Sequence, residues 1–178
     1  MKINQLVWQH GGLAALISVI LSLVAYIIGV EALVGWPLGV AQSLLIMITM
    51  IVVSRAIRVD EGGIINFSRL LGHIMISVVC ILVSSFIFNL VLFNLIDPEL
   101  INTVADITLE RVEGMMESFG LEEDLLEQTL SETESEIRKG YTLSGSIVGL
   151  IYGSAFWGLI ALIIAAIFKR SPENKINF

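Results

Sequence analysis

The chain has 178 residues, 56% of them hydrophobic, and a mean hydropathy of +0.87. This composition excludes an ordinary soluble domain, because the apolar residues gather in long blocks instead of following an amphipathic pattern. The net charge of −7 comes from one acidic segment, and the sequence holds no basic, aromatic-rich region of the kind that binds nucleic acid.

Four apolar blocks are long enough to cross the ~30 Å hydrocarbon core of a bilayer, which takes about 20 helical residues. They cover about residues 6–28, 33–53, 70–96 and 141–168. A membrane β-barrel is excluded, since its strands alternate polar and apolar residues and these blocks do not. The sequence therefore predicts an all-α polytopic membrane protein with four transmembrane helices. A cleaved signal peptide is disfavoured, because the first block leads directly into the second.

Small residues recur at helical spacing in the first two predicted spans and would let neighbouring helices approach closely. They are Gly11, Ala15, Ser18 and Ser22 in the first span, and Gly35, Gly39 and Ser43 in the second. The connection between the two spans is short and nearly uncharged. We therefore expect a tight antiparallel pair of helices with Trp36 at the membrane interface.

The third predicted span follows a loop in which Gly62 and Gly63 are expected to break the helix. The span from residue 70 to 96 would be ~40 Å long, so the helix must tilt or protrude. Four polar residues lie along it: Ser77, Ser84, Asn89 and Asn94. They are candidates for a polar path through the bundle. For Asn89 and Asn94 the alternative is interhelical hydrogen bonding, at roughly 0.6 to 2 kcal/mol each.

The segment of residues 97–140 carries 13 of the 17 acidic residues. Asp97, Pro98 and Glu99 are typical of a helix start, and Gly120 is typical of a helix end. Apolar residues on both sides of Gly120 recur at helical spacing. The segment is therefore predicted to be an amphipathic helical hairpin between the third and fourth spans.

Three apolar residues of this hairpin, Met115, Met116 and Phe119, are a candidate partner-binding patch, because methionine-rich surfaces adapt to different partners. Packing between the two hairpin helices is the alternative explanation. The carboxylates do not follow the spacing of a calcium-binding loop. The acidic face is therefore interpreted as solvated.

The fourth predicted span has the strongest packing signal, a glycine at every fourth position. Gly145, Gly149 and Gly153 form this ridge, and Trp157, Ala161 and Ala165 continue it in the same phase. Such a ridge allows another helix backbone to approach closely. The partner helix can come from the same chain or from a second copy.

Lys and Arg residues are unequally divided between the two sides of the membrane. With the N-terminus in the cytoplasm, that side holds seven of them and the other side holds three. Cytoplasmic loops are enriched in Lys and Arg. We therefore expect both termini in the cytoplasm and the acidic hairpin outside.

Catalytic and metal-binding patterns are missing from the sequence. The deep parts of the spans contain no ionisable acid, base or histidine, and the two histidines, His10 and His73, make a weak metal site without a third ligand. Cys80 is the single cysteine, so no disulfide can form within the chain. No phosphate-binding loop or nucleophile–base set is present. We therefore expect no enzyme activity, no metal and no cofactor.

Several short motifs occur in an order that resembles one family. They are the loop ending in Gly62-Gly63-Ile64-Ile65-Asn66-Phe67, the Ile96-Asp97-Pro98-Glu99 turn, the acidic hairpin from Met115 to Glu123 and the glycine-rich last span. Together they cover nearly the whole chain and are similar to the uncharacterised bacterial four-span membrane proteins grouped as a domain of unknown function. Ile65-Asn66 departs from that family's usual loop. The resemblance implies a protein of the bacterial cytoplasmic membrane and supplies no catalytic residues.

Two functions are compatible with these features. The leading hypothesis is a non-catalytic interaction or scaffold subunit, whose partners are the lipid bilayer and either a second copy or another membrane protein. Abundant packing motifs and the lack of buried ionisable groups favour it. The alternative is a small transporter or channel component with a polar path along the third span.

Overall fold

The computed structural model describes residues 3–120 and 123–169. Its elements are α1 (Ile3–Ile28), α2 (Val30–Leu33), α3 (Trp36–Asp60), α4 (Phe67–Val91), the π-helix η1 (Leu92–Ile96), α5 (Leu100–Ser118), α6 (Glu123–Gly140) and α7 (Leu143–Phe168). Four helices, α1, α3, α4 with η1, and α7, are long and apolar enough to cross a membrane. The predicted all-α fold with four spans is confirmed, and the chain is an integral membrane protein.

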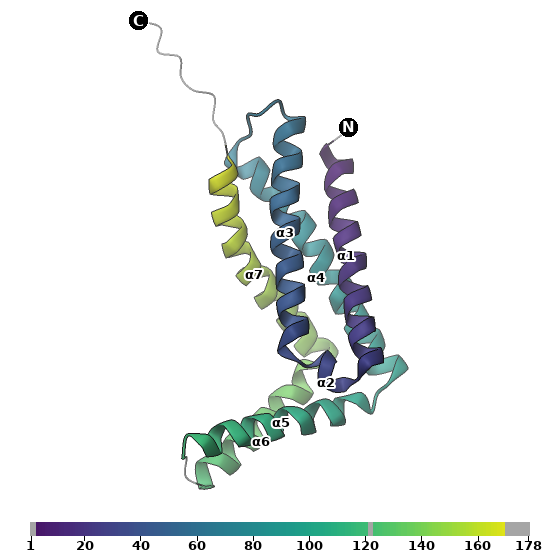
Figure 1. Cartoon of the computed structure of the whole chain (residues 1–178), viewed down its shortest axis with the longest axis vertical. Coiled ribbons are helices and arrows are strands. Elements are labelled where there is room, and N and C mark those ends of the chain that lie inside the picture. Colours follow the sequence, from purple (N-terminus) through teal and green to yellow (C-terminus); the bar gives the residue numbers. More distant parts are fainter. Residues whose placement is uncertain (1–2, 121–122, 170–178) are drawn as a thin grey trace, which may run out of the picture.

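The four long helices run side by side as a bundle, in which α4 contacts the other three (Figure 1). The start of α1, the loop of residues 61–66 and the end of α7 lie at one end, here called the loop end. α2 and the α5–α6 hairpin lie at the other, here called the hairpin end. At the hairpin end α5 and α6 run across the bundle axis instead of along it (Figure 1).

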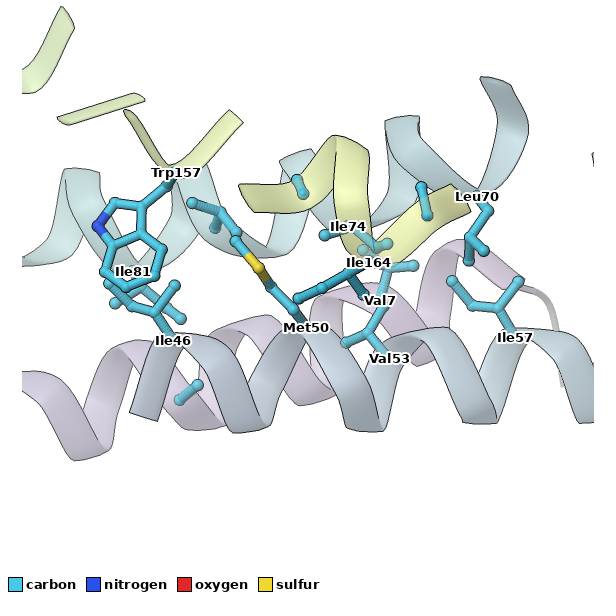
Figure 2. Close-up of a cluster of buried hydrophobic side chains, with 14 of the residues drawn as sticks. Val7, Ile46, Met50, Val53, Ile57, Leu70, Ile74, Ile81, Trp157 and Ile164 are labelled. Atoms are coloured by element: carbon cyan, nitrogen blue, oxygen red, sulfur yellow. The ribbon is translucent and has the colours of Figure 1, made fainter. Parts of the chain in front are cut away.

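The main hydrophobic core fills the half of the bundle nearer the loop end. Met50 of α3 lies between Trp157 on one side and Val53 and Ile164 on the other (Figure 2). The four spans and the loop before α4 contribute the other members: Val7, Ala14, Ala15, Ile46, Ile57, Ile65, Leu70, Ile74, Val78, Ile81, Ala161 and Ala165. Close packing of this kind holds helices together in a bilayer, where the lipid tails are as apolar as the side chains.

A smaller core closes the hairpin end. Leu92, Phe93, Leu100 and Val104 are buried together where the end of the third span meets the start of α5. The ring centroids of Phe93 and Tyr141 lie 4.0 Å apart, which joins η1 to the segment between α6 and α7. The hairpin is therefore anchored to the bundle at both of its ends.

Several helix boundaries differ by a few residues from the predicted ranges, and tertiary contacts explain two of these differences. α5 begins at Leu100 and not at Asp97, whose carboxylate accepts a hydrogen bond from the Tyr26 hydroxyl at 3.2 Å. α3 continues to Asp60, beyond the end of the predicted span at about residue 53 and up to the break expected at Gly62 and Gly63, and Ile57 in this extension is fully buried. Both differences are explained by tertiary contacts of residues near the ends of the predicted spans: Asp97 bonds to Tyr26 of α1, and Ile57 is buried in the core.

Glycines end α3 and α5 where the sequence predicts breaks. Gly62 and Gly63, with φ of +69° and +93°, follow α3, and Gly120, with φ of +68°, follows α5. Residues with a Cβ rarely adopt this left-handed conformation. The helix breaks predicted at these three glycines are confirmed.

Candidate functional site

A cluster of hydrogen-bonded polar side chains lies where three spans meet, between the two cores. The Ser18 hydroxyl of α1 donates to Gln42 Oε1 of α3 at 2.5 Å. Gln42 Nε2 in turn donates to the Ser18 carbonyl at 3.2 Å and to Ser22 Oγ at 3.0 Å. Ser18 Oγ also lies 2.9 Å from Ser85 Oγ of α4. Because the single hydroxyl proton of Ser18 already points to Gln42, Ser85 is the donor in this bond.

This polar cluster differs from the other buried hydroxyl groups of the bundle. Thr49, Ser54 and Ser77 each donate to the carbonyl oxygen four residues earlier in their own helix. Ser18 and Ser22 instead take part in bonds between helices. Among the described residues, no buried polar side-chain atom lacks a partner. The cluster therefore ties α1, α3 and α4 together in the hairpin half of the bundle.

A cavity of about 470 Å³ opens beside the polar cluster, between α3, α4 and α7. The polar side chains in its wall are Ser22, Gln42, Ser43, Ser85 and Asn89, and the aromatic ones are Phe93, Tyr141 and Trp157. A second cavity of about 250 Å³ lies between α4 and α7 and shares Ser85, Asn89 and Tyr141. Burial raises the pKa of the Tyr141 phenol above its ordinary value, because desolvation disfavours the charged form.

α7 packs against the bundle with the half nearer the loop end. Its buried residues, Trp157, Ala161, Ile164 and Ala165, all belong to that half, and none of residues 143–156 is buried. In its most apolar window 17% of the residues are buried, against 28–33% in the other three spans. The half of α7 that carries the glycine ridge therefore presents a face that the described part of the chain does not cover.

The three ridge glycines have different surroundings. A Cβ at Gly145 would collide with the Lys139 carbonyl, so the tight connection between α6 and α7 requires this glycine. Thr142 caps α7 in the same connection, where its hydroxyl oxygen accepts from Gly145 N at 3.1 Å. At Gly149 and Gly153 a Cβ would meet no atom within 4 Å. Within the described chain, these two glycines serve no close helix contact, although Gly149 lines the second cavity, between α4 and α7.

The other packing candidates are also divided between helix contacts and open space. A Cβ at Gly11 would lie 3.1 Å from Ser77 Cα, so α1 and α4 are in backbone contact there, and Ala15 is buried one turn further on. Gly35 precedes α3, where a Cβ would lie 2.8 Å from a carbonyl oxygen of the preceding turn. Gly39 lines the larger cavity. Gly11 thus serves contact between spans, and Gly35 serves a turn.

The four polar candidates of the third span lie in different surroundings. Ser77 is fully buried, and Ser84 lines a groove between α1 and α4. Asn89 belongs to the walls of both cavities, and the exposed Asn94 donates to the Leu90 carbonyl at 2.9 Å. Successive residues turn by about 100° around a helix, so Ser77 and Ser84, seven residues apart, share one side of α4, whereas Asn89 points to another side. Of the four, Asn89 borders the two polar cavities.

The structure separates the three candidates on the hairpin. Met115 and Phe119 are 56% and 75% exposed, whereas Met116 is half-buried. At the other end of the bundle, His73 Nδ1 donates to the Arg69 carbonyl at 2.5 Å. In the described ranges no three His, Cys, Asp or Glu side chains lie close enough to hold a metal ion.

Gln42 is the site residue that sequence reasoning missed. It is the one amide side chain in the apolar stretch of the second span. A polar residue in a membrane span is costly without a partner and therefore indicates a bonding site. Ser18 and Ser22 of the first span, one helical turn apart, fit a packing face by their size, and their hydroxyls fit this amide equally well as hydrogen-bond partners.

Comparison with known proteins gives a family without an assigned activity. No curated protein and no solved structure matches the chain. A family model, described as "Protein of unknown function (DUF4199)", matches residues 9–170 and thus includes all four spans and the hairpin. This agrees with the resemblance to an uncharacterised family seen in the sequence. The chain belongs to this family, and it is an integral membrane protein of unknown function.

Proposed function

We propose that this protein is a non-catalytic interaction subunit of the membrane that self-associates through the hairpin half of α7. The observation that carries the proposal is the open space at Gly149 and Gly153 in a membrane span. Glycine in a helix interior is about 1 kcal/mol less favourable than alanine. Small residues four positions apart, in turn, are a recurring feature of helix pairs in membranes. A second helix on this face would offset the cost of the two glycines.

The side chains beside the glycines support this proposal. Phe156 lies seven residues from Gly149, close to two full turns, and therefore shares its face. Tyr152 lies three residues from Gly149. The side chain of Tyr152 is 72% exposed, and that of Phe156 is 59% exposed. An aromatic side chain therefore protrudes from the surface of α7 next to the hollow that each glycine leaves. Under two-fold symmetry the same faces meet, so a ring of each copy can enter the glycine hollow of the other.

The replacement of Gly149 by isoleucine is expected to weaken this association. The larger side chain fills the hollow and holds the two backbones apart, so we expect at least a tenfold loss of affinity, which is about 1.4 kcal/mol or more. Energy transfer between donor-labelled and acceptor-labelled full-length chains, measured in vesicles over a range of protein-to-lipid ratios, gives the affinity.

Gly72→Ile is the matched control, since Gly72 lies near the loop end of α4 and a Cβ there also meets nothing within 4 Å. It should leave energy transfer unchanged. Equal affinities for the wild type and Gly149→Ile would remove the basis of the proposal. Equal thermal melting of the two variants in detergent would show that the monomer fold is retained in both.

We also propose that the protein lies in a bacterial cytoplasmic membrane with both termini in the cytoplasm. The positive charges at the loop end support this orientation. Among the described residues they are Arg55, Arg58, Arg69 and Lys169; the other three residues counted on the cytoplasmic side, Lys2, Arg170 and Lys175, lie outside the described residues. At the hairpin end, Arg138 and Lys139 form ion pairs with Glu134 and Glu136, at 2.9 and 3.3 Å.

Cysteine labelling tests this orientation. With Cys80→Ala as background, single cysteines replace Glu117 in the hairpin and Asn66 in the loop, both of which are exposed. A membrane-impermeant maleimide added to intact cells should label position 117 and leave position 66 unlabelled until the cells are opened. The reverse pattern would place the hairpin in the cytoplasm.

The polar wall of the larger cavity favours a second candidate function, a small transporter or channel component. Gln42 and Asn89 offer amide groups to a solute within the apolar part of the bundle. Flux of a polar solute into reconstituted vesicles, abolished by Asn89→Leu and not by Gly149→Ile, would favour this function over self-association. The open face of α7 gives the interaction subunit the stronger support.

A further inference from the structure

The direction of the hairpin places one of its faces next to the membrane surface. α5 starts at the hairpin end of the bundle and runs across it, so the hairpin tip extends sideways beyond the spans (Figure 1). Trp36, 80% exposed, begins α3 at this end and marks the membrane interface there. The residues from Arg111 to Phe119 cover about 12 Å of helix. Spans that cross the bilayer thus bring the hairpin to the level of the lipid headgroups.

The face of α5 that covers the bundle end continues towards the tip. Leu100 and Val104 are buried against the bundle, and Arg111 Nη1 donates to the Val34 carbonyl at 3.3 Å. Met115 lies one turn further along the same face. The side chain of Met115 is 56% exposed, so the bundle does not cover it as it covers Leu100 and Val104. Beyond the edge of the bundle, this face of α5 is therefore turned towards the surface of the lipid bilayer.

Charge divides α5 in the same way. Asp106, Glu110, Glu113 and Glu117 follow one another at spacings of four, three and four, and all four are exposed. This spacing places them on one side of the helix, roughly opposite Arg111 and Met115. Acidic groups thus point away from the membrane plane, and the guanidinium group of Arg111 lies on the side of the lipid phosphates.

We infer that the tip of the hairpin is a membrane-surface anchor, with Met115 and Phe119 inserted among the lipids of the protein's own bilayer. Phe119 is 75% exposed, and Leu125, at the start of α6, is 48% exposed. An amphipathic helix that lies in the interface buries its apolar side chains below the headgroups and keeps its charged face in water. The bilayer is the occupant because the same face is continuous with the protein surface that closes the ends of the spans. This inference is independent of self-association through α7.

Spin labels on the full-length chain in phospholipid vesicles test the inference. Single cysteines replace Met115, Phe119, Glu113 and Glu117 in turn, in the Cys80→Ala background, and carry a nitroxide. Collision rates are measured with oxygen, which concentrates in lipid, and with a nickel chelate, which stays in water. Positions 115 and 119 should collide mainly with oxygen, and positions 113 and 117, each two residues away on the acidic side, mainly with the chelate.

Two other results would overturn the inference. Collision of positions 115 and 119 with the chelate at the rates of 113 and 117 would mean that the tip stands in water. Low collision rates with both reagents at 115 and 119 would mean that protein, not lipid, covers the tip. Repeating the oxygen measurement in detergent-free vesicles at several protein-to-lipid ratios separates a second copy from the bilayer, because only contact with a second copy changes with dilution.

Discussion

Replacement of Gly11 by leucine is expected to lower the free energy of unfolding by about 3 kcal/mol, at the upper end of the range for overpacked cores. A Cβ at Gly11 already lies 3.1 Å from Ser77 Cα, and this neighbour is a backbone atom of α4 that no side-chain rotation can move away. The three further carbons of leucine must therefore push α1 off α4. Because Ser18 and Ser22 follow along α1, the same displacement strains the polar cluster.

The next residue supplies the control for this prediction. Gly12 is exposed, and a Cβ there meets nothing within 4 Å. Gly12→Leu should leave the free energy of unfolding unchanged or raise it by up to about 1 kcal/mol, because leucine is the better helix former. Unfolding of both variants in mixed micelles with increasing dodecyl sulfate, followed by circular dichroism, gives the comparison. Similar losses in Gly11→Leu and Gly12→Leu would show that α1 and α4 are not in backbone contact.

Gln42→Leu is expected to lower the free energy of unfolding by about 2 kcal/mol, since hydrogen bonds between membrane helices contribute about 0.6 to 1.7 kcal/mol each. The substitution removes the three bonds that Gln42 makes with Ser18 and Ser22. Leucine has a similar size, so the loss reports the bonds and not a void.

Asn89→Leu removes an amide of similar polarity from a neighbouring part of the bundle and serves as the control. The Asn89 side chain makes no hydrogen bond with any described residue, so its replacement should change the free energy of unfolding by less than about 0.5 kcal/mol. The same titration with dodecyl sulfate measures both variants. A loss in Asn89→Leu as large as in Gln42→Leu would show that general polarity, and not the cluster, is responsible.

The fold could be predicted from the sequence largely because membrane spans depend on local composition. A helix that crosses lipid satisfies its own backbone groups, so the length of each apolar block decides the element. Contacts between elements explain the differences. Tyr26 and Asp97 are far apart in sequence, and only folding brings the hydroxyl to the carboxylate that would otherwise cap α5. Burial of Ile57 likewise extends α3 past the point where Arg55 interrupts the apolar block.

The candidate site could be predicted less well, because small residues have several possible roles. Spacing identifies Gly145 and Gly149 as equivalent, yet the first is required by a turn and the second lies in open space. The polar cluster depends on the register between α1, α3 and α4, and the sequence of one chain does not contain this register. Gln42 is the single amide in the second span, and Ser18 and Ser22 lie one turn apart in the first span. Because a polar side chain in a span is costly without a partner, this pattern nevertheless indicates that these groups are hydrogen-bonded to one another.

Cross-linking along α7 tests the central claim most directly, that a second copy covers the open face of this helix. Single cysteines replace Gly149, Phe156, Ile151 and Leu162 in turn, in the Cys80→Ala background, and disulfides are formed with an oxidant in native membranes. Gly149 and Phe156 share the proposed face, while Ile151 and Leu162 lie on the far side of the helix. We predict covalent dimers at positions 149 and 156 and none at 151 and 162. Dimers at all four positions, or at none, would contradict the claim.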